Sequence, residues 1–163
     1  MIKFSAPKKC GGVLAGACLL VVVWFIVISI VGTPRGLLHM LSVKSCIMSS
    51  WLFLVLATIY YILCGAAAGK VLCLCRWRGE IYAYRGLFFL SVAITLGYLW
   101  YALFFGAGYF LPAALLACAS FLCLTVAALN FRVFSYLSVH LIWVCAAVSA
   151  YFLIVSIFSF FCL

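Results

Sequence analysis

The sequence predicts an all-α membrane protein with a single domain over residues 1–163, built as a five-transmembrane-helix bundle. Two features of its composition point this way: 72% of the residues are hydrophobic and only 7% are charged, whereas soluble domains are about half apolar and a quarter charged. The third observation is that the apolar residues gather in runs of about 20, the length that crosses a bilayer as a helix. Strand-like alternation of polar and apolar residues is absent.

Charged residues and clusters of glycine or proline divide the chain into five apolar runs. They cover residues 13–31, 51–69, 87–105, 109–129 and 134–158. A segment inside hydrocarbon must satisfy its own backbone hydrogen bonds. Runs of this length, rich in leucine, alanine, phenylalanine and valine, therefore suit helices better than the strands of a barrel.

The first run follows Lys8 and Lys9 and has some features of a secretory signal peptide. Its apolar stretch is longer than the hydrophobic region of such peptides, and the Gly-Thr-Pro-Arg sequence at 32–35 is not a small-x-small cleavage site. We therefore expect residues 13–31 to be retained as the first membrane helix.

Short connections follow the third and fourth runs. A Gly-Ala-Gly sequence at 106–108 separates the third run from the fourth, so these helices are expected to be antiparallel neighbours. Residues 130–133 join the fourth run to the fifth, and the longer loops cover residues 32–50 and 70–86. We expect the 32–50 loop to act as a lid or entrance, because loops carry variable function on a rigid scaffold.

The basic residues indicate how the helices are oriented in the membrane. In a five-span topology eight fall on one side and two on the other: Lys3, Lys8, Lys9, Lys70, Arg76, Arg78, Arg85 and Arg132 against Arg35 and Lys44. The positive-inside rule then favours a cytoplasmic N-terminus and 70–86 loop, with the opposite orientation, in which the 32–50 loop faces the cytosol, as the alternative. The net charge of +9 comes from residues that flank the runs and suit anionic headgroups, so we expect no nucleic-acid partner.

The ten cysteines are interpreted mainly as packing residues. Five of them lie inside the runs, where a free thiol behaves as a small hydrophobe. The C-x2-C spacing of a metal site is absent, so no metal is expected. Cys73 and Cys75 lie beside basic residues at a membrane boundary, where palmitoylation is an alternative to packing.

Small residues recur at four-residue spacing inside the runs. The pairs are Gly12 and Gly16, Gly65 and Gly69, Ala113 and Ala117, and Ala146 and Ala150. This spacing lets membrane helices approach closely. The approach is either within the chain, which we favour, or between two copies in a homodimer.

Three segments share a distinctive pattern of aromatic and small residues. They are LGYLWYALFFG at 96–106, the second run with Trp51, Thr58, Tyr61 and GAAAG at 65–69, and LIWVCAA at 141–147. In this order they resemble the tryptophan-rich sensory protein and translocator protein family, also called peripheral-type benzodiazepine receptors. The chain length and the expected number of helices agree with that family.

The resemblance implies a five-helix bundle, often dimeric, whose central pocket binds tetrapyrroles, sterols or synthetic aromatic ligands. It implies a receptor or a transport-associated protein that requires no cofactor, with a porphyrin or haem as a ligand. The chain departs from the family pattern at polar positions while keeping the scaffold. Residues 43–49 lack the tryptophan and the prolines of the family's loop, and Ala57 stands where the family has a pocket tryptophan. At positions where the family has asparagine, serine or proline, this chain has Gly97, Tyr101, Ala102 and Tyr151.

The inventory of side chains argues against catalysis, so we expect no enzyme. The one acidic residue, Glu80, lies in a basic loop, and no run carries the buried acid typical of proton-coupled transporters. A Ser-His-Asp triad, a carboxylate pair and a glycine-rich phosphate loop are all missing. His140 and His39 are interpreted as a helix-contact residue and a loop residue, with haem ligation by His140 and an entrance position for His39 as the alternatives.

Aromatic residues make up 18% of the chain and are its most informative chemical feature. Flat apolar ligands need concave walls of aromatic surface with few polar anchors. The predicted ligand-binding residues, from segments that match the family's pocket-forming helices, are Tyr61, Trp100, Phe104, Trp143 and Ala147. Helix packing or an interface belt is the alternative, and we favour the belt for Trp51 and Trp77 near the ends of runs.

The sequence therefore predicts a membrane receptor or translocator-like protein that binds a flat apolar ligand of the porphyrin or sterol class without catalysis. The alternative is a structural or assembly subunit whose helices pack in a larger membrane complex. The dispersed small-residue faces and the lost polar residues favour that alternative. A small-molecule carrier would need an inverted repeat or paired broken helices, and the sequence shows neither.

Overall fold

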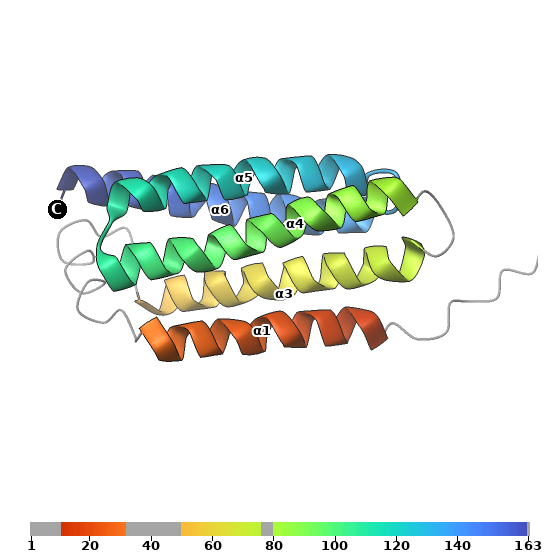
Figure 1. Ribbon diagram of the computed structural model, residues 1–163, viewed down its shortest axis with the longest axis horizontal. Helices are drawn as coiled ribbons and strands as arrows, with labels where there is room; N and C mark the ends of the chain where they lie inside the picture. The colour runs from red at the N-terminus through yellow and green to blue at the C-terminus, as the bar shows by residue number, and fades with distance from the viewer. Residues whose placement is uncertain (1–10, 32–49, 76–79, 163) are drawn as a thin grey trace, which may run out of the picture.

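The computed structural model describes residues 11–31, 50–75 and 80–162, and these residues form five long helices. The helices are α1 (Gly11–Val31), α3 (Ser50–Cys75), α4 (Glu80–Tyr101), α5 (Phe110–Phe131) and α6 (Tyr136–Cys162). A short π-helix, η1 (Ala102–Ala107), continues α4. The helices run side by side along the long axis of the molecule (Figure 1), and the predicted all-α class with five helices is confirmed.

Four of these helices are long and apolar enough to cross a bilayer. Their apolar stretches are Leu52–Leu74, Ile81–Ala107, Phe110–Phe131 and Tyr136–Phe161, and α1 contributes a shorter one, Ala15–Val31. Large apolar side chains cover the outer surface, for example Leu115 at 67% and Ile154 at 61% exposure. Such a surface is unfavourable in water and suits lipid, so the chain is an integral, multi-pass membrane protein.

Two helices extend beyond the predicted runs into charged sequence. Helix α3 continues past residue 69 to Cys75, and α4 begins at Glu80 rather than at residue 87. Lys70 and Arg85 limit the apolar runs, but long basic side chains reach the headgroups from within a helix. A charged residue therefore ends the apolar run without ending the helix.

The helices follow the order α1, α3, α6, α5, α4 around the bundle. The most extensive contacts join α4 to α5, α5 to α6, and α1 to α3. Helix α3 also packs along α6, whereas its contact with α4 is sparse. The molecule thus consists of an α1–α3 pair and an α4–α6 unit, and the predicted neighbours α4 and α5 lie side by side (Figure 1).

The connection between α4 and α5 is a tight turn that requires glycine. After η1, Gly108 adopts a φ of 70°, in the left-handed region that other residues enter only at a cost. The backbone N–H of Tyr109 donates to the carbonyl of Leu103 at 3.0 Å and closes the turn. The segment that ends in Leu-Phe-Phe-Gly therefore finishes α4 in a widened helical turn and reverses the chain into α5.

Helices α1 and α3 approach closely at two glycines. A Cβ atom added to Gly65 would lie 2.6 Å from the Cα of Ala17, and one added to Gly16 would lie 3.1 Å from the carbonyl oxygen of Gly65. The backbones can come this close only where side chains are absent. Of the other predicted small residues, Gly69, Ala113, Ala117 and Ala146 are buried within the chain, whereas Ala150 is only partly buried. A homodimer stays a prediction.

Part of the sequence-based interpretation falls outside the described residues. It concerns the 32–49 segment with His39, the basic residues Lys3, Lys8, Lys9, Arg35, Lys44, Arg76 and Arg78, Trp77, and the side chain of Trp51. Three other basic residues belong to described positions: Lys70 near the end of α3, Arg85 near the start of α4, and Arg132 directly after α5. These positions share one end of the bundle (Figure 1), in keeping with the predicted topology.

Candidate ligand-binding cavity

An internal cavity of about 20 Å³ lies where all five helices meet. Its walls combine aromatic rings with small side chains. The lining residues are Trp24, Ala57, Tyr60, Tyr61, Gly97, Trp100, Tyr101, Ala117, Ser120, Ser149 and Phe152. A volume of this size holds about one water molecule.

The helical period explains how four of the helices present their lining residues. Residues three or four positions apart share one face of a helix. The sets are Ala57, Tyr60 and Tyr61 on α3, Gly97, Trp100 and Tyr101 on α4, Ala117 and Ser120 on α5, and Ser149 and Phe152 on α6. Each set therefore occupies about one turn of one helix face, and Trp24 of α1 completes the wall.

The rings of the wall pack against one another in two groups. The indole of Trp24 lies 4.9 Å, centroid to centroid, from the rings of both Tyr61 and Tyr101. Trp100 stacks on Phe152 at 4.6 Å with an interplanar angle of 11°. Aromatic pairs in such arrangements contribute about 0.5–1.5 kcal/mol each beyond burial. The wall is therefore made of flat apolar faces, which complement a flat ring system.

Three hydroxyl groups at the cavity already act as donors. Ser120 donates to the carbonyl of Ala93 at 3.1 Å, so Tyr60 is the donor across the 3.4 Å between its hydroxyl and Ser120 Oγ. Ser149 donates to the carbonyl of Ala117 at 3.3 Å. The oxygens of these hydroxyls keep lone pairs and can still accept hydrogen bonds.

The two tryptophans of the cavity differ in how their indole N–H groups are paired. Trp100 Nε1 donates to Ser156 Oγ at 2.8 Å. Trp24 Nε1 has no acceptor among the residues that the structure describes, although its side chain is only 1% exposed. An unpaired buried donor costs about 1–3 kcal/mol, and buried polar groups are seldom left unpaired. Trp24, one of the residues that line the cavity, thus has an unpaired indole N–H in largely apolar surroundings.

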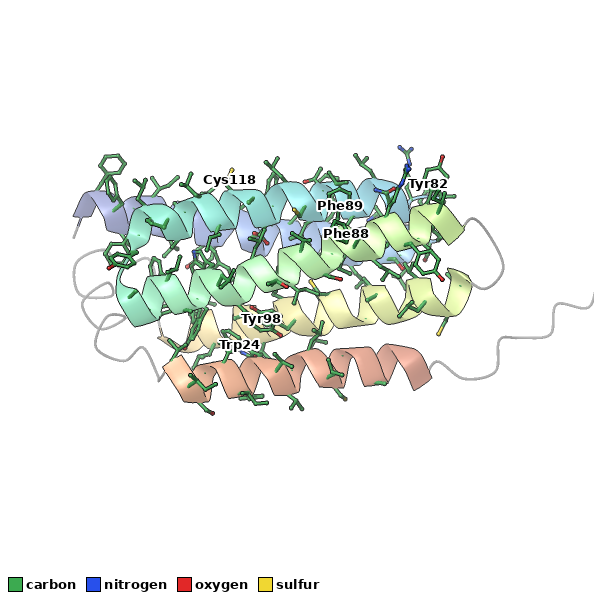
Figure 2. All side chains as sticks on the ribbon, viewed as in Figure 1. Trp24, Tyr82, Phe88, Phe89, Tyr98 and Cys118 are labelled. Atoms are coloured by element: carbon green, nitrogen blue, oxygen red, sulfur yellow. The ribbon has the colours of Figure 1, made fainter. Side chains whose placement is uncertain are left out.

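Tyr98 covers Tyr61 on the side where α1 and α4 face each other. Its ring stacks on Tyr61 at 4.6 Å with an interplanar angle of 8°, and its hydroxyl donates to the carbonyl of Leu20 on α1 at 3.0 Å. Figure 2 shows Tyr98 and Trp24 close together on the side of α4 that faces α1. Few other contacts join these two helices. Tyr98 thus packs over Tyr61, one of the residues that line the cavity, and also contacts α1.

Two of the five predicted ligand-binding residues line the cavity, namely Tyr61 and Trp100. Phe104 is fully buried and stacks on Trp100 at 5.1 Å, behind the lining. Trp143, at 46% exposure, and Ala147 lie on the outer face of α6. The structure therefore does not bring the five residues together at one cavity, and ligand binding by any of them stays a prediction.

Sequence reasoning missed several lining residues, chiefly Trp24, Tyr60 and Phe152. For Trp24 a signal existed in the sequence. It lies eight residues after Gly16, and hence on the same helix face as the glycine that packs against α3. On α3, Tyr61 lies four residues before Gly65 on the corresponding face. Small residues thus mark the inward faces of both helices.

No group of three or more His, Cys, Asp or Glu side chains that could hold a metal ion occurs in the described part of the chain. His140 is exposed near the start of α6 and does not line the cavity. Cys64 and Cys145 are buried about one helical turn from the cavity, with Sγ atoms 3.5 Å apart. Both thiols are free, and they lie where α3 packs against α6.

Comparisons with models of protein families, with curated proteins and with solved structures find no match to this chain. The geometry of the cavity and the sequence features above are therefore the basis for inferring its function.

Proposed function

We propose that the chain is a membrane receptor or translocator-like protein that takes a flat apolar ligand, of the porphyrin or sterol class, from the bilayer into this cavity. Helix α1 acts as the fifth membrane span, and binding proceeds without catalysis. The observation that carries the proposal is the aromatic wall formed by Trp24, Tyr61, Trp100 and Phe152. The resemblance of three segments to the translocator protein family supports the same class of ligand.

Ligand binding requires the cavity to open. Pockets for small molecules have volumes of about 300–1,000 Å³, whereas this cavity measures about 20 Å³. Phe152 is placed to make room, because its ring lies against Trp100 on the cavity wall. We expect rotation of this ring about its side-chain bonds to be the first step in enlarging the cavity.

The route from the bilayer passes between α1 and α4, where Tyr98 packs over Tyr61. Rotation of Tyr98 breaks its hydrogen bond to Leu20 and its stack on Tyr61. These two contacts together are worth about 1–3 kcal/mol. A conformation a few kcal/mol above the ground state is populated at about 0.1–10%, which is enough to admit a ligand that is concentrated in the membrane.

The proposal is tested by titrating the protein in lipid nanodiscs with protoporphyrin IX and with a fluorescent sterol analogue. Binding to empty nanodiscs is subtracted, and the wild type is compared with Tyr61→Ala and Trp143→Ala. We expect saturable binding that Tyr61→Ala weakens about tenfold, the equivalent of one aromatic contact, and that Trp143→Ala leaves unchanged. Weakening by Trp143→Ala alone would instead place the site on the outer face of α6.

The small volume of the cavity favours one other candidate, a structural or assembly subunit of a membrane complex. A core filled by its own rings suits such a role, and the exposed Trp143 and Ala147 on α6 would then face a partner helix. This candidate predicts no saturable binding of either ligand. It also predicts a partner protein that stays bound during purification in mild detergent and is released by Trp143→Ala.

A further inference from the structure

We infer that the cavity selects ligands that carry a hydrogen-bond-accepting oxygen, and that Trp24 Nε1 on α1 is the group that recognises this oxygen. The inference rests on the proposed function, because it takes a flat apolar ligand to occupy the cavity. It adds a polar requirement to a site whose aromatic surface alone would be unselective. The expected ligand class is a flat, largely apolar ring system with a carbonyl or hydroxyl oxygen at its edge.

The first observation is the unpaired donor itself. Trp24 lines the cavity with only 1% of its side chain exposed, and no group in the described part of the chain accepts a hydrogen bond from its Nε1. Buried tryptophan N–H groups usually have a partner, and hydrocarbon offers none. The donor therefore favours any ligand that brings an acceptor to it.

The second observation is the pairing of the neighbouring polar groups. The hydroxyls of Tyr60, Ser120 and Ser149 donate to groups on α4 and α5. The other indole of the wall, Trp100, donates to Ser156 at 2.8 Å. Of the two tryptophans that line the cavity, Trp24 thus has an unpaired indole N–H, whereas the N–H of Trp100 is already paired.

The preference for an oxygen follows from the low polarity of the surroundings. A ligand without an acceptor keeps the N–H of Trp24 buried and unpaired, whereas an accepting oxygen pairs it. A net hydrogen bond corresponds to a change of about threefold to about tenfold in affinity. The preference for an oxygen-bearing ligand also holds if one water occupies the cavity and accepts a hydrogen bond from Trp24. An apolar ligand displaces that water without replacing the hydrogen bond.

Two probes that differ at a single ring position test the inference. 9-Fluorenone carries a carbonyl where fluorene carries a methylene, on the same flat ring system. Saturable binding is measured in lipid nanodiscs for the wild type, Trp24→Phe and Trp100→Phe. Each dissociation constant is expressed as a probe concentration in the lipid, so that a difference in partitioning between the two probes does not count as a difference in affinity. We expect the wild type and Trp100→Phe to prefer fluorenone by about threefold to about tenfold, and Trp24→Phe to bind the two probes equally.

The outcomes separate the inference from the proposed function. The inference is overturned if the wild type binds both probes with equal affinity. It is also overturned if the preference for fluorenone survives in Trp24→Phe or disappears in Trp100→Phe. Each of these results leaves the proposed function standing. If neither probe binds saturably, the inference fails, whereas the proposed function stands or falls on the protoporphyrin and sterol titrations described above. Binding of fluorene by Trp24→Phe shows that the variant is folded. If that binding is lost, replacing Trp24 by 3-benzothienylalanine, which keeps the shape of tryptophan without its N–H, decides between the outcomes.

Discussion

Replacing Phe152 by alanine tests whether its ring keeps the cavity closed. The ring contacts three others, Trp100 at 4.6 Å, Phe53 at 5.4 Å and Tyr151 at 6.1 Å. At about 0.5–1.5 kcal/mol for each pair, the three contacts together are worth about 1.5–4.5 kcal/mol. We expect Phe152→Ala to lower the free energy of unfolding by this amount. Loss of apolar burial adds little, since lipid chains are as apolar as the core.

The same substitution removes the ring that an entering ligand has to displace. If about 1.4 kcal/mol of the displacement cost is thereby avoided, protoporphyrin IX binds the variant about tenfold more tightly than the wild type. Saturating ligand then restores part of the lost stability, because it binds only the folded protein. Both quantities are measured by unfolding in mixed micelles of a mild detergent and dodecyl sulfate, with and without the ligand.

Phe160→Ala is the matched control for this experiment. Phe160 lies on the same helix, but it is 49% exposed and its ring packs on the neighbouring Phe161. Its loss is expected to cost about 1 kcal/mol or less and to leave ligand affinity unchanged. A Phe152→Ala protein that is destabilised yet binds protoporphyrin no more tightly than the wild type refutes ring displacement as the opening step.

Three further substitutions test the contacts between helices by the same unfolding assay. Gly65→Val places a side chain where even a Cβ would lie 2.6 Å from the Cα of Ala17, so α1 must move outward, at a loss of about 1–3 kcal/mol. Gly108→Ala costs about 1–2 kcal/mol from backbone strain alone, because φ is 70° and no atom lies within 4 Å of the added Cβ. Ser120→Ala removes the acceptor 3.4 Å from the buried hydroxyl of Tyr60 and costs about 1 kcal/mol. Adding Tyr60→Phe to Ser120→Ala recovers most of that loss, because neither partner is then left unpaired.

The two glycine predictions share a control, Gly106→Ala. A Cβ at Gly106 would make an ordinary contact with Val31 Cγ1 at 3.4 Å, so we expect little change in stability. An equal loss in Gly106→Ala and Gly108→Ala would contradict the strain argument. Wild-type stability in Gly65→Val would contradict the close approach of α1 and α3. A double variant as unstable as Ser120→Ala would show that the serine hydroxyl acts on a group other than Tyr60.

The class of the fold and the number of helices could be predicted because lipid imposes them. A segment in hydrocarbon has to be a helix or part of a closed barrel, so the apolar runs translate directly into helices. The helix ends were less predictable, as Lys70 and Arg85 show. Both lie inside helices although they flank apolar runs, because the interfacial turns of a membrane helix tolerate charge.

The cavity was predictable only in part, because in a membrane helix the core and the lipid-facing surface are equally apolar. Trp143 and Trp24 both lie well inside apolar runs, yet Trp143 is 46% exposed and Trp24 only 1%. The hydrophobic period that separates inward from outward faces in soluble helices carries no such information here. Tyr61 and Trp100, which line the cavity, were among the residues expected from the family resemblance, whereas Trp24 has a signal only in its spacing to Gly16.

The division of the bundle into an α1–α3 pair and an α4–α6 unit bears on how the site is made. Membrane helices insert first and pack afterwards, and each of the two parts has extensive contacts of its own. The cavity lies where the two parts meet, so it comes into existence only when they dock. A ligand that touches Trp24 on one part and Trp100 on the other would hold the docked state together. The amount of fully assembled protein in the membrane would then follow the supply of the ligand.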